Sequence, residues 1–239
     1  MLGSCGAWPE PGRACSGYLL EHDGVRVVLD LGYGTAGRLF GLLGAAPPDA
    51  VVITHAHPDH VVDLHALFRC LHYGGGGRIP VFAAAGVAEV MAALDPDDAP
   101  AVATVFDMRA LPGAAYRIGP LILESVALPH YVPNAGVRLS APGLTVAYTG
   151  DTGPSSQLAG LARDADLFIA DSTNRPPLNL TAQQAGEAAA EAGARRLLLT
   201  HFWPGADREA CRSAAAAAYP GEILLADEGL TVDLGGRES

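Results

Sequence analysis

Histidine and aspartate side chains are concentrated in one six-residue stretch of this 239-residue chain. The stretch reads His55-Ala-His57-Pro-Asp59-His60 and directly follows the apolar run Val51–Thr54. Such groups are costly to bury unless something pairs with them, and a divalent metal ion is a suitable partner. Imidazole nitrogen and carboxylate oxygen are both zinc ligands, and the absence of cysteine here favours a catalytic metal site over a closed structural one.

Three further side chains of the same kinds follow other apolar runs. His130 comes after Leu121–Leu128, Asp151 after Leu144–Thr149, and His201 after Leu197–Thr200. If these runs are strands that lie side by side, the loops at their ends converge on one site held by a rigid scaffold. The candidate metal ligands are therefore His55, His57, Asp59, His60, His130, Asp151 and His201.

Seven ligands are too many for one tetrahedral zinc ion and suit two ions. Two ions about 3.5 to 4 Å apart can share a water and be bridged by a carboxylate, and they lower the pKa of that water so that it supplies a hydroxide nucleophile. We therefore expect a dinuclear centre with two Zn²⁺ ions. The ligand types leave Mn²⁺ or Fe open.

The elements that must position these ligands alternate between strands and helices. Short apolar runs bounded by turn residues predict strands at 25–29, 51–54, 121–128, 144–149, 167–170 and 197–200. Val61, Leu64, Phe68 and Leu71 recur at helical spacing, and Asp59 is expected to cap that helix. The alternation predicts an α/β architecture in which helices cover the sheets.

Two later segments carry helix signals. Thr181 and Gln184 predict a capping box for a helix that Gly193 ends. The alanine-rich segment 208–219 predicts another helix because of its high helix propensity.

Composition limits the classes of protein. A length of 239 residues with 49% hydrophobic residues fits a single domain, 1–239. The net charge of −11 argues against long nucleic acid as the main partner, since such binding rests on clustered Lys and Arg. A small ester substrate fits better. The start of the chain lacks a signal-peptide pattern and no run of eighteen apolar residues occurs, so we expect a cytoplasmic protein outside the membrane.

The metal motifs together resemble the metallo-β-lactamase-fold hydrolases. The residues that carry the resemblance are His55-x-His57-x-Asp59-His60, His130, Thr149-Gly150-Asp151-Thr152 and Leu199-Thr200-His201-Phe202. Their details are most similar to the ribonuclease Z branch and related small phosphodiesterases, and the similarity spans nearly the whole chain. It implies a four-layer αβ/βα sandwich, with two mixed sheets flanked by helices.

The resemblance also implies roles for the ligands. One zinc ion would be bound by His55, His57 and His130, the other by Asp59, His60 and His201, with Asp151 as the bridge. In ribonuclease Z-like enzymes the aspartate at the position of Asp59 is also credited with accepting a proton from the attacking water, and a purely ligating Asp59 is an equal alternative.

Two positions depart from the ribonuclease Z pattern. Asp171 stands where those enzymes often have Glu, and Asn179 where they often have His. The Glu–His pair assists the leaving group, so Asp171 is a candidate catalytic residue, whereas Asn179 has no titratable proton. The short turn at Leu139–Leu144 replaces the long basic arm of tRNA-processing members, so tRNA processing is not expected.

The leading hypothesis is a dinuclear metal-dependent phosphodiesterase that acts on a small ester. A thioester or lactone hydrolase on the same metal centre is the first alternative, and a non-catalytic metal-binding accessory protein is the second. Related enzymes commonly dimerise, which leaves a homodimer open. Asp30 is expected to support the ligands by hydrogen bonding or to serve in a turn, rather than to be a ligand itself. Arg138 is a candidate phosphate-binding residue, with a structural or solvent-exposed role as an equal alternative.

Overall fold

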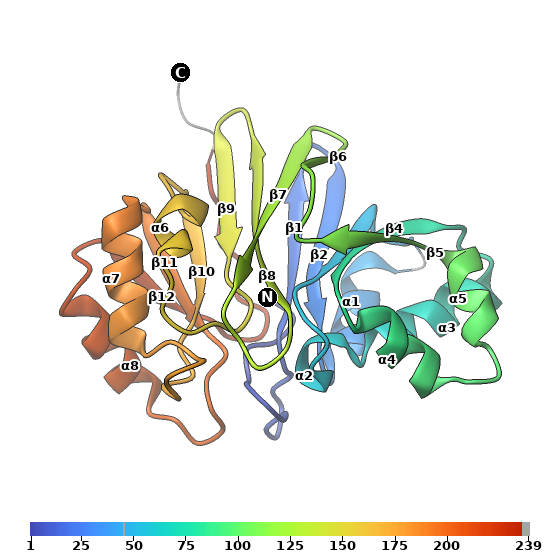
Figure 1. Cartoon of the computed structure of the whole chain (residues 1–239), viewed down its shortest axis with the longest axis horizontal. Coiled ribbons are helices and arrows are strands. Elements are labelled where there is room, and N and C mark those ends of the chain that lie inside the picture. Colours follow the sequence, from blue (N-terminus) through green and yellow to red (C-terminus); the bar gives the residue numbers. More distant parts are fainter. Residues whose placement is uncertain (45, 236–239) are drawn as a thin grey trace.

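The computed structural model describes residues 1–44 and 46–235 as two β-sheets that pack face to face, with helices on both outer faces (Figure 1). The first sheet has the order β1 (Gly17–His22), β2 (Val25–Leu31), β3 (Ala50–Ile53), β4 (Ile79–Ala84) and β5 (Phe106–Leu111). The second has the order β12 (Glu222–Leu225), β11 (Arg196–Thr200), β10 (Leu167–Asp171), β9 (Leu144–Tyr148), β8 (Asn134–Ala141), β7 (Leu121–Leu128) and β6 (Tyr116–Ile118). The predicted αβ/βα sandwich is confirmed.

The helices divide between the two outer faces. On the side of the first sheet lie α1 (Thr35–Leu43), α2 (Pro58–Val61), α3 (Leu64–Gly74), α4 (Val87–Leu94) and α5 (Ala99–Val105). On the side of the second sheet lie α6 (Gln157–Leu161), α7 (Ala182–Ala192) and α8 (Arg208–Ala216). Each strand of the inner layers can therefore bury both of its faces.

Strand direction brings the ends of the predicted strands to one edge of the sandwich. In the first sheet β2, β3, β4 and β5 run parallel, and in the second β9, β10, β11 and β12 do. The carboxyl ends of parallel strands lie at the same edge of a sheet, which is where ligands bind in open α/β sheets. A hydrogen bond of 2.9 Å from the Ala135 amide to the Thr54 carbonyl joins the two sheets at this edge.

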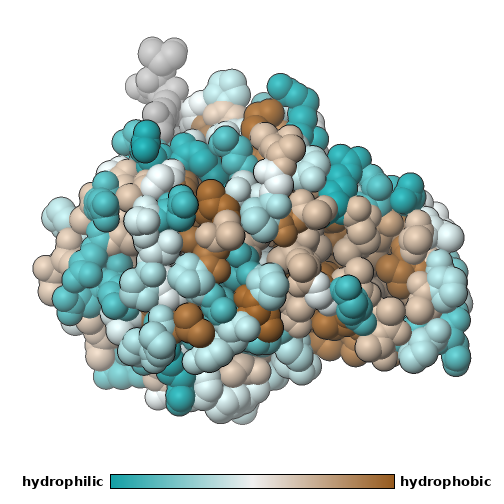
Figure 2. All heavy atoms as spheres, in the orientation of Figure 1, coloured by the Kyte–Doolittle hydropathy of each residue, from teal (hydrophilic) through white to brown (hydrophobic). Residues whose placement is uncertain are grey.

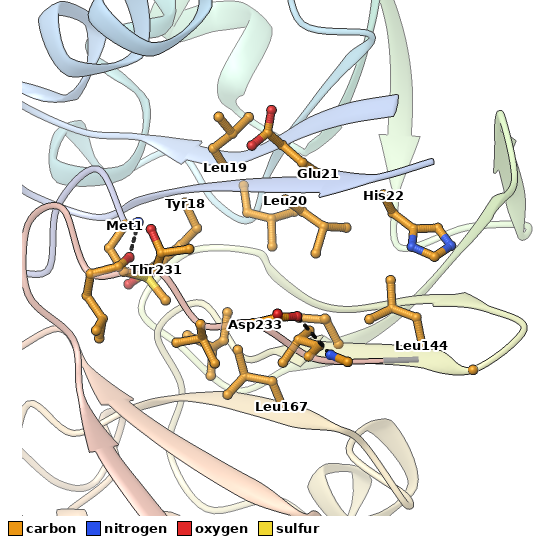
Figure 3. Close-up of a pocket in the computed structure, with 18 of the residues that line it drawn as sticks. Met1, Tyr18, Leu19, Leu20, Glu21, His22, Leu144, Leu167, Thr231 and Asp233 are labelled. Carbon is orange, nitrogen blue, oxygen red and sulfur yellow. Dashed lines mark hydrogen bonds between the residues drawn. The ribbon is translucent and has the colours of Figure 1, made fainter. Parts of the chain in front are cut away.

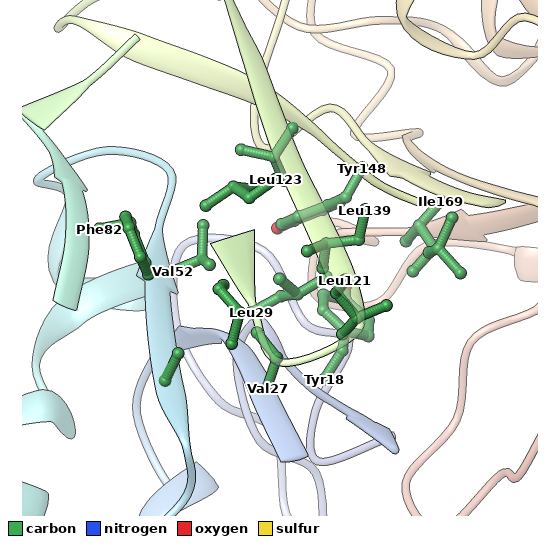
Figure 4. Close-up of a cluster of buried hydrophobic side chains, with 14 of the residues drawn as sticks. Tyr18, Val27, Leu29, Val52, Phe82, Leu121, Leu123, Leu139, Tyr148 and Ile169 are labelled. Atoms are coloured by element: carbon green, nitrogen blue, oxygen red, sulfur yellow. The ribbon is translucent and has the colours of Figure 1, made fainter. Parts of the chain in front are cut away.

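The central core lies between the sheets (Figure 4). Alternate residues of β2 face different layers, because side chains of a strand point to opposite faces in turn. Val27 and Leu29 pack against the second sheet, whereas Val28 packs under the helices of the first. Leu139 and Tyr148 contribute from the opposite sheet (Figure 4). The site is thus built on the rim of a rigid, apolar layer.

The helix expected after the histidine motif is two helices, and the predicted cap is wrong. Pro58 is the first residue of α2, His57 precedes it in extended conformation, and Asp59 lies inside the helix. Proline is common at the first position of a helix, because the backbone N–H at that position has no intrahelical acceptor and proline loses nothing by lacking it. The helix α3 starts separately after Asp63. Asp59 is therefore free to direct its carboxylate away from the helix backbone.

The other helix signals are largely confirmed. Thr181 and Gln184 form the predicted capping box of α7, and Gly193 ends the helix in left-handed conformation with φ of 66°. The helix α8 ends at Ala216, three residues before the predicted end at 219. All six predicted strands are present within one or two residues of their expected ends.

Hydrophilic and hydrophobic residues are interspersed on the face of the molecule in Figure 2, and hydrophobic ones gather over α4 and α5. Leu94, at the end of α4, is among the exposed apolar side chains. Within residues 1–44 and 46–235, the helices are too short or too polar to cross a membrane.

Candidate metal centre

The structure brings all seven predicted ligands together at the carboxyl edge of the sheets. They fall into two groups whose ligating atoms lie within 4.8 Å of one another: His55, His57, His130 and Asp151 in the first, and Asp59, His60 and His201 in the second. Each group approaches from more than one loop, because β3, β7, β9 and β11 all end at this edge.

In the first group the ring nitrogens face one another closely. His55 Nε2 lies 3.1 Å from His57 Nδ1, and His130 Nε2 lies 3.2 Å from that same His57 atom. Tetrahedral zinc ligands at about 2.0 to 2.1 Å from the ion lie roughly 3.4 Å apart. The spacing of these nitrogens therefore matches a shared ion.

The second group has the same spacing. His201 Nε2 lies 3.1 Å from Asp59 Oδ2, and His60 Nε2 lies 3.8 Å from it. Asp151 stands between the groups: its Oδ1 is 3.2 Å from His60 Nε2 and 3.3 Å from His201 Nε2, while its Oδ2 is 3.7 Å from His130 Nε2. One carboxylate thus presents one oxygen to each group.

Hydrogen bonds fix which nitrogen of three histidines faces the centre. His130 Nδ1 donates to the Leu178 carbonyl at 2.9 Å, and His60 Nδ1 donates to Asp30 Oδ2 at 2.7 Å. His201 Nδ1 donates to the Thr173 hydroxyl at 2.6 Å, and that hydroxyl donates in turn to the Asp171 carboxylate. A neutral imidazole with Nδ1–H so engaged has its lone pair on Nε2, as a metal ligand needs.

Two buried atoms at the centre lack a hydrogen-bond partner among the described residues: His60 Nε2 and Asp151 Oδ1. Buried polar atoms are normally satisfied, so such a pair calls for an explanation, and an ion is one of them. Both atoms point to the same place, 3.2 Å apart. The residues present therefore fit bound metal ions.

In the metal-free centre, positively charged histidines lie next to negatively charged aspartates. Burial lowers the pKa of His60, but the carboxylates of Asp151, Asp30 and Asp59 raise it more, to about 10. Burial likewise lowers the pKa of His201, and Asp151 leads the groups that raise it well above its ordinary value. In the metal-free protein at neutral pH both rings are therefore positively charged, and a metal ion must displace the second proton, the one on Nε2.

The pKa values of His55, His57 and two carboxylates, Asp59 and Asp151, are lowered instead. Burial lowers the pKa of His55 and His57, assisted by neighbouring imidazoles. Burial raises the pKa of Asp59 and Asp151, but the adjacent His60 and His201 lower both more strongly. His55 and His57 are therefore neutral and the two aspartates ionised, which are the forms that bind metal.

Asp171 lies beside the centre, buried, with both oxygens engaged. Its Oδ1 accepts from the Thr173 amide and hydroxyl, and its Oδ2 accepts from Asn179 Nδ2 at 2.9 Å. Asn179 Nδ2 also lies 3.4 Å from Asp151 Oδ2. The two positions that depart from the ribonuclease Z pattern thus contact each other, and Asn179 also contacts Asp151. Their part in protonating a leaving group stays a prediction.

Sequence reasoning missed several supporting groups. Tyr148 donates to Asp30 at 2.8 Å, and the Ala7 amide donates to Asp59 Oδ2 at 2.6 Å. Thr173, two residues after Asp171, had a recognisable signal as a hydroxyl close to a strand-end carboxylate, whereas a backbone amide carries no sequence signal. Arg138 donates to the carbonyls of Leu161 and Arg163, which is a structural role.

A separate cavity of about 540 Å³ lies at the opposite end of the sandwich, near the turn between β8 and β9 (Figure 3). Its walls include Tyr18, Leu20, Leu144 and Leu167, and the seven candidate ligands take no part in them. The concentration of histidine and aspartate therefore places the chemistry at the other end.

These features define a class of protein: a two-sheet α/β sandwich with a candidate histidine–aspartate metal site at the carboxyl edge of its strands. The chain belongs to the beta-lactamase superfamily, because the model of the beta-lactamase superfamily domain matches residues 25–202. The resemblance drawn from the motifs is confirmed.

Relatives agree with this assignment. An uncharacterized protein of Mycobacterium leprae is 33% identical over 98% of this chain and 87% of its own length. The crystal structure of the metallo-beta-lactamase fold protein YhfI from Bacillus subtilis matches with a TM-score of 0.86 and 26% identity, covering 96% of each chain. Ribonuclease Z of Kineococcus radiotolerans is 29% identical over 92% of this chain and 89% of its own length.

Proposed function

We propose that this protein is a dinuclear metal-dependent hydrolase that cleaves a phosphodiester. The observation that carries the proposal is the split carboxylate of Asp151, with Oδ1 at 3.2 and 3.3 Å from the second group and Oδ2 at 3.7 Å from the first. A carboxylate in that position is the natural bridge between two ions. Two bound Zn²⁺ ions, or Mn²⁺ or Fe, would lower the pKa of a shared water and polarise the phosphoryl oxygen under attack.

The residues of the chain supply the remaining requirements. The Nδ1 contacts of His60, His130 and His201 orient their rings before any ion binds, which is how surrounding groups tune a metal site. Asp59, held ionised by His60 and His201, is proposed to ligate one ion and to lie next to the attacking water. Its depressed pKa makes it a weak base, so ligation is its main proposed role.

Asp171 is proposed to position His201 through Thr173. Its two oxygens accept bonds from surrounding donors, and the described contacts place a hydroxyl between it and the ligand ring. The choice of a phosphodiester over a carbonyl ester is supported by the relative named ribonuclease Z. The net charge of −11 and the short Pro142-Gly143 turn between β8 and β9 favour a small substrate over tRNA.

Hydrolysis of bis-p-nitrophenyl phosphate by pure protein, loaded with zinc or with manganese, tests the proposal. We expect turnover with at least one metal and none after chelation. Absence of turnover with both metals, where a control phosphodiesterase is active, would contradict it.

A further inference from the structure

The loop between β10 and α7 touches the candidate metal centre at two points. Thr173 Oγ1 lies 2.6 Å from His201 Nδ1, and the Leu178 carbonyl lies 2.9 Å from His130 Nδ1. Arg175 lies between these two contacts and is exposed. Arg175 therefore belongs to a segment that is anchored to the candidate centre on both sides.

Aromatic rings fix that guanidinium in place. The Cζ atom of Arg175 lies 3.5 Å from the centre of the Trp203 ring, a cation–π contact. Trp8 packs edge-on against the same ring, with centroids 5.0 Å apart and planes at 80°. Both tryptophans are tied to the centre, because Trp203 follows His201 by two residues and the Ala7 amide, next to Trp8, donates to Asp59.

Arg175 differs from most arginines of this acidic chain in having no acidic partner. Arg69, Arg78 and Arg208, for example, each form an ion pair with an aspartate. Over the described ranges, 1–44 and 46–235, the ion pairs include no carboxylate for Arg175. A guanidinium stacked on a ring by its face keeps its N–H groups in its own plane, directed outwards from the stack. Its positive charge is available to an anion that reaches the centre.

We propose that Arg175, held on Trp203, is a substrate-binding residue that selects anionic phosphodiesters over neutral esters. This inference rests on the proposed function and adds its source of specificity. The paired N–H groups of a guanidinium match two oxygens of one phosphate, in a charge-assisted contact that a carbonyl ester cannot make. The stacking on Trp203 fixes the plane of that contact before substrate arrives.

Steady-state kinetics of matched variants test the selection. Arg175→Gln removes the positive charge beside Trp203. The control, Arg78→Gln, removes a positive charge directly before β4, at the edge of the sheet opposite the candidate centre. For bis-p-nitrophenyl phosphate we expect Arg175→Gln to raise KM roughly tenfold with kcat changed less than about threefold, and Arg78→Gln to match the parent. Arg175→Lys should recover only part of the loss, because an ammonium group is a point charge without the planar fork.

For neutral p-nitrophenyl acetate we expect equal KM values in all variants. An equal rise for both substrates, or no rise for either, would overturn the inference.

A binding measurement separates this inference from the proposed function. The chain has two tryptophans, Trp8 and Trp203, which contact each other. Intrinsic tryptophan fluorescence therefore reports only on the surroundings of these two rings, which include Arg175. Phenylphosphonate, which has no ester bond to hydrolyse, is titrated into zinc-loaded protein, with benzyl alcohol as the neutral probe. We expect Arg175→Gln to weaken phenylphosphonate binding roughly tenfold and to leave benzyl alcohol unaffected.

The two results together assign the cause of any failure. Weakened phenylphosphonate binding without phosphodiester turnover would remove the proposed reaction and keep the anion site. Equal phenylphosphonate affinity in Arg175→Gln and in the parent would overturn the anion site, whatever the enzyme hydrolyses.

Discussion

His60 Nδ1 donates to Asp30 Oδ2 over 2.7 Å, and both side chains are fully buried. Asp30 also accepts from the Thr54 amide, the Thr54 hydroxyl and the Tyr148 hydroxyl, at 2.7 to 2.8 Å. Its backbone lies in the left-handed region with φ of 56°, a conformation that surrounding contacts must hold. Asp30 therefore sets the orientation of His60 and joins β2, β3 and β9 beneath the metal centre.

Asp30→Asn should weaken metal binding without removing a ligand. The amide group places an N–H where Asp30 accepts, so His60 loses its fixed orientation. We expect metal affinity to fall about 10- to 100-fold, measured by competition with a chelator. Asp63→Asn is the matched control, since Asp63 accepts from the Ala36 amide at the start of α1. Equal affinity in Asp30→Asn and the parent would show that the hydrogen bond does not support the ligand.

Metal binding should release protons. The pKa of His60 is raised to about 10 and that of His201 is raised well above 6.5, so near pH 7.5 both hold a proton in the metal-free protein. Binding must displace about two protons from these rings, and apparent affinity should rise with pH until about 10. Calorimetric titration of zinc in buffers of different ionisation enthalpy counts them. A binding enthalpy independent of the buffer would contradict these pKa shifts.

Thr173→Val should interrupt the contact between Asp171 and His201. The methyl group cannot accept from His201 Nδ1, so we expect metal affinity to fall about 10- to 100-fold, while Thr173→Ser keeps the parent value. The double variant with Asp171→Asn should lose less than the sum of the two single losses, because both break one chain of contacts.

The pH–rate profile of Asp171→Asn tests the other role of Asp171. If Asp171 positions His201, the variant keeps the limb at high pH. Loss of that limb would instead show that Asp171 protonates the leaving group.

Gly32→Ala should disturb the centre through the backbone. A Cβ atom on Gly32 would lie 1.8 Å from the Asp59 carbonyl oxygen, so the segment that carries Asp59 must move. We expect reduced metal content together with a lower free energy of unfolding, measured by denaturant titration. A Cβ atom on Gly37 in α1 would have no neighbouring atom within 4 Å, so Gly37→Ala should raise the free energy of unfolding by about 1 kcal/mol. Parent-like metal content in Gly32→Ala would contradict the close approach.

Much of the fold was predictable because its strands are apolar on both faces and end at chemically conspicuous residues. Val51, Leu121 and Leu197 mark three such runs. The edge strands β1, β5, β6 and β12 were missed, since half-exposed strands have mixed composition. The interior strands β4 and β8 were missed as well. The turn predicted at Leu139–Leu144 is confined to Pro142 and Gly143, because β8 extends to Ala141 and β9 begins at Leu144. Pro58 divides the helix after the motif, and the misplaced cap at Asp59 shows that a carboxylate next to a helix start is ambiguous. The single-domain assignment over 1–239 stays a prediction.

The clustering of the seven candidate ligands was predictable from residue type and strand ends, but the groups that support them were not. The Leu178 carbonyl and the Ala7 amide reach His130 and Asp59 from distant segments, and backbone groups have no signature in sequence. The contact of Arg175 with Trp203 likewise depends on two loops that only the fold brings together.

The central claim is that Asp151 bridges two metal ions. Metal content by elemental analysis and hydrolysis of bis-p-nitrophenyl phosphate, measured on the parent and on Asp151→Ala, test it most directly. We predict about two ions per parent chain, one or fewer in the variant, and a fall in rate of more than about 100-fold. One ion in the parent, or a variant with unchanged metal content and rate, would contradict the dinuclear centre.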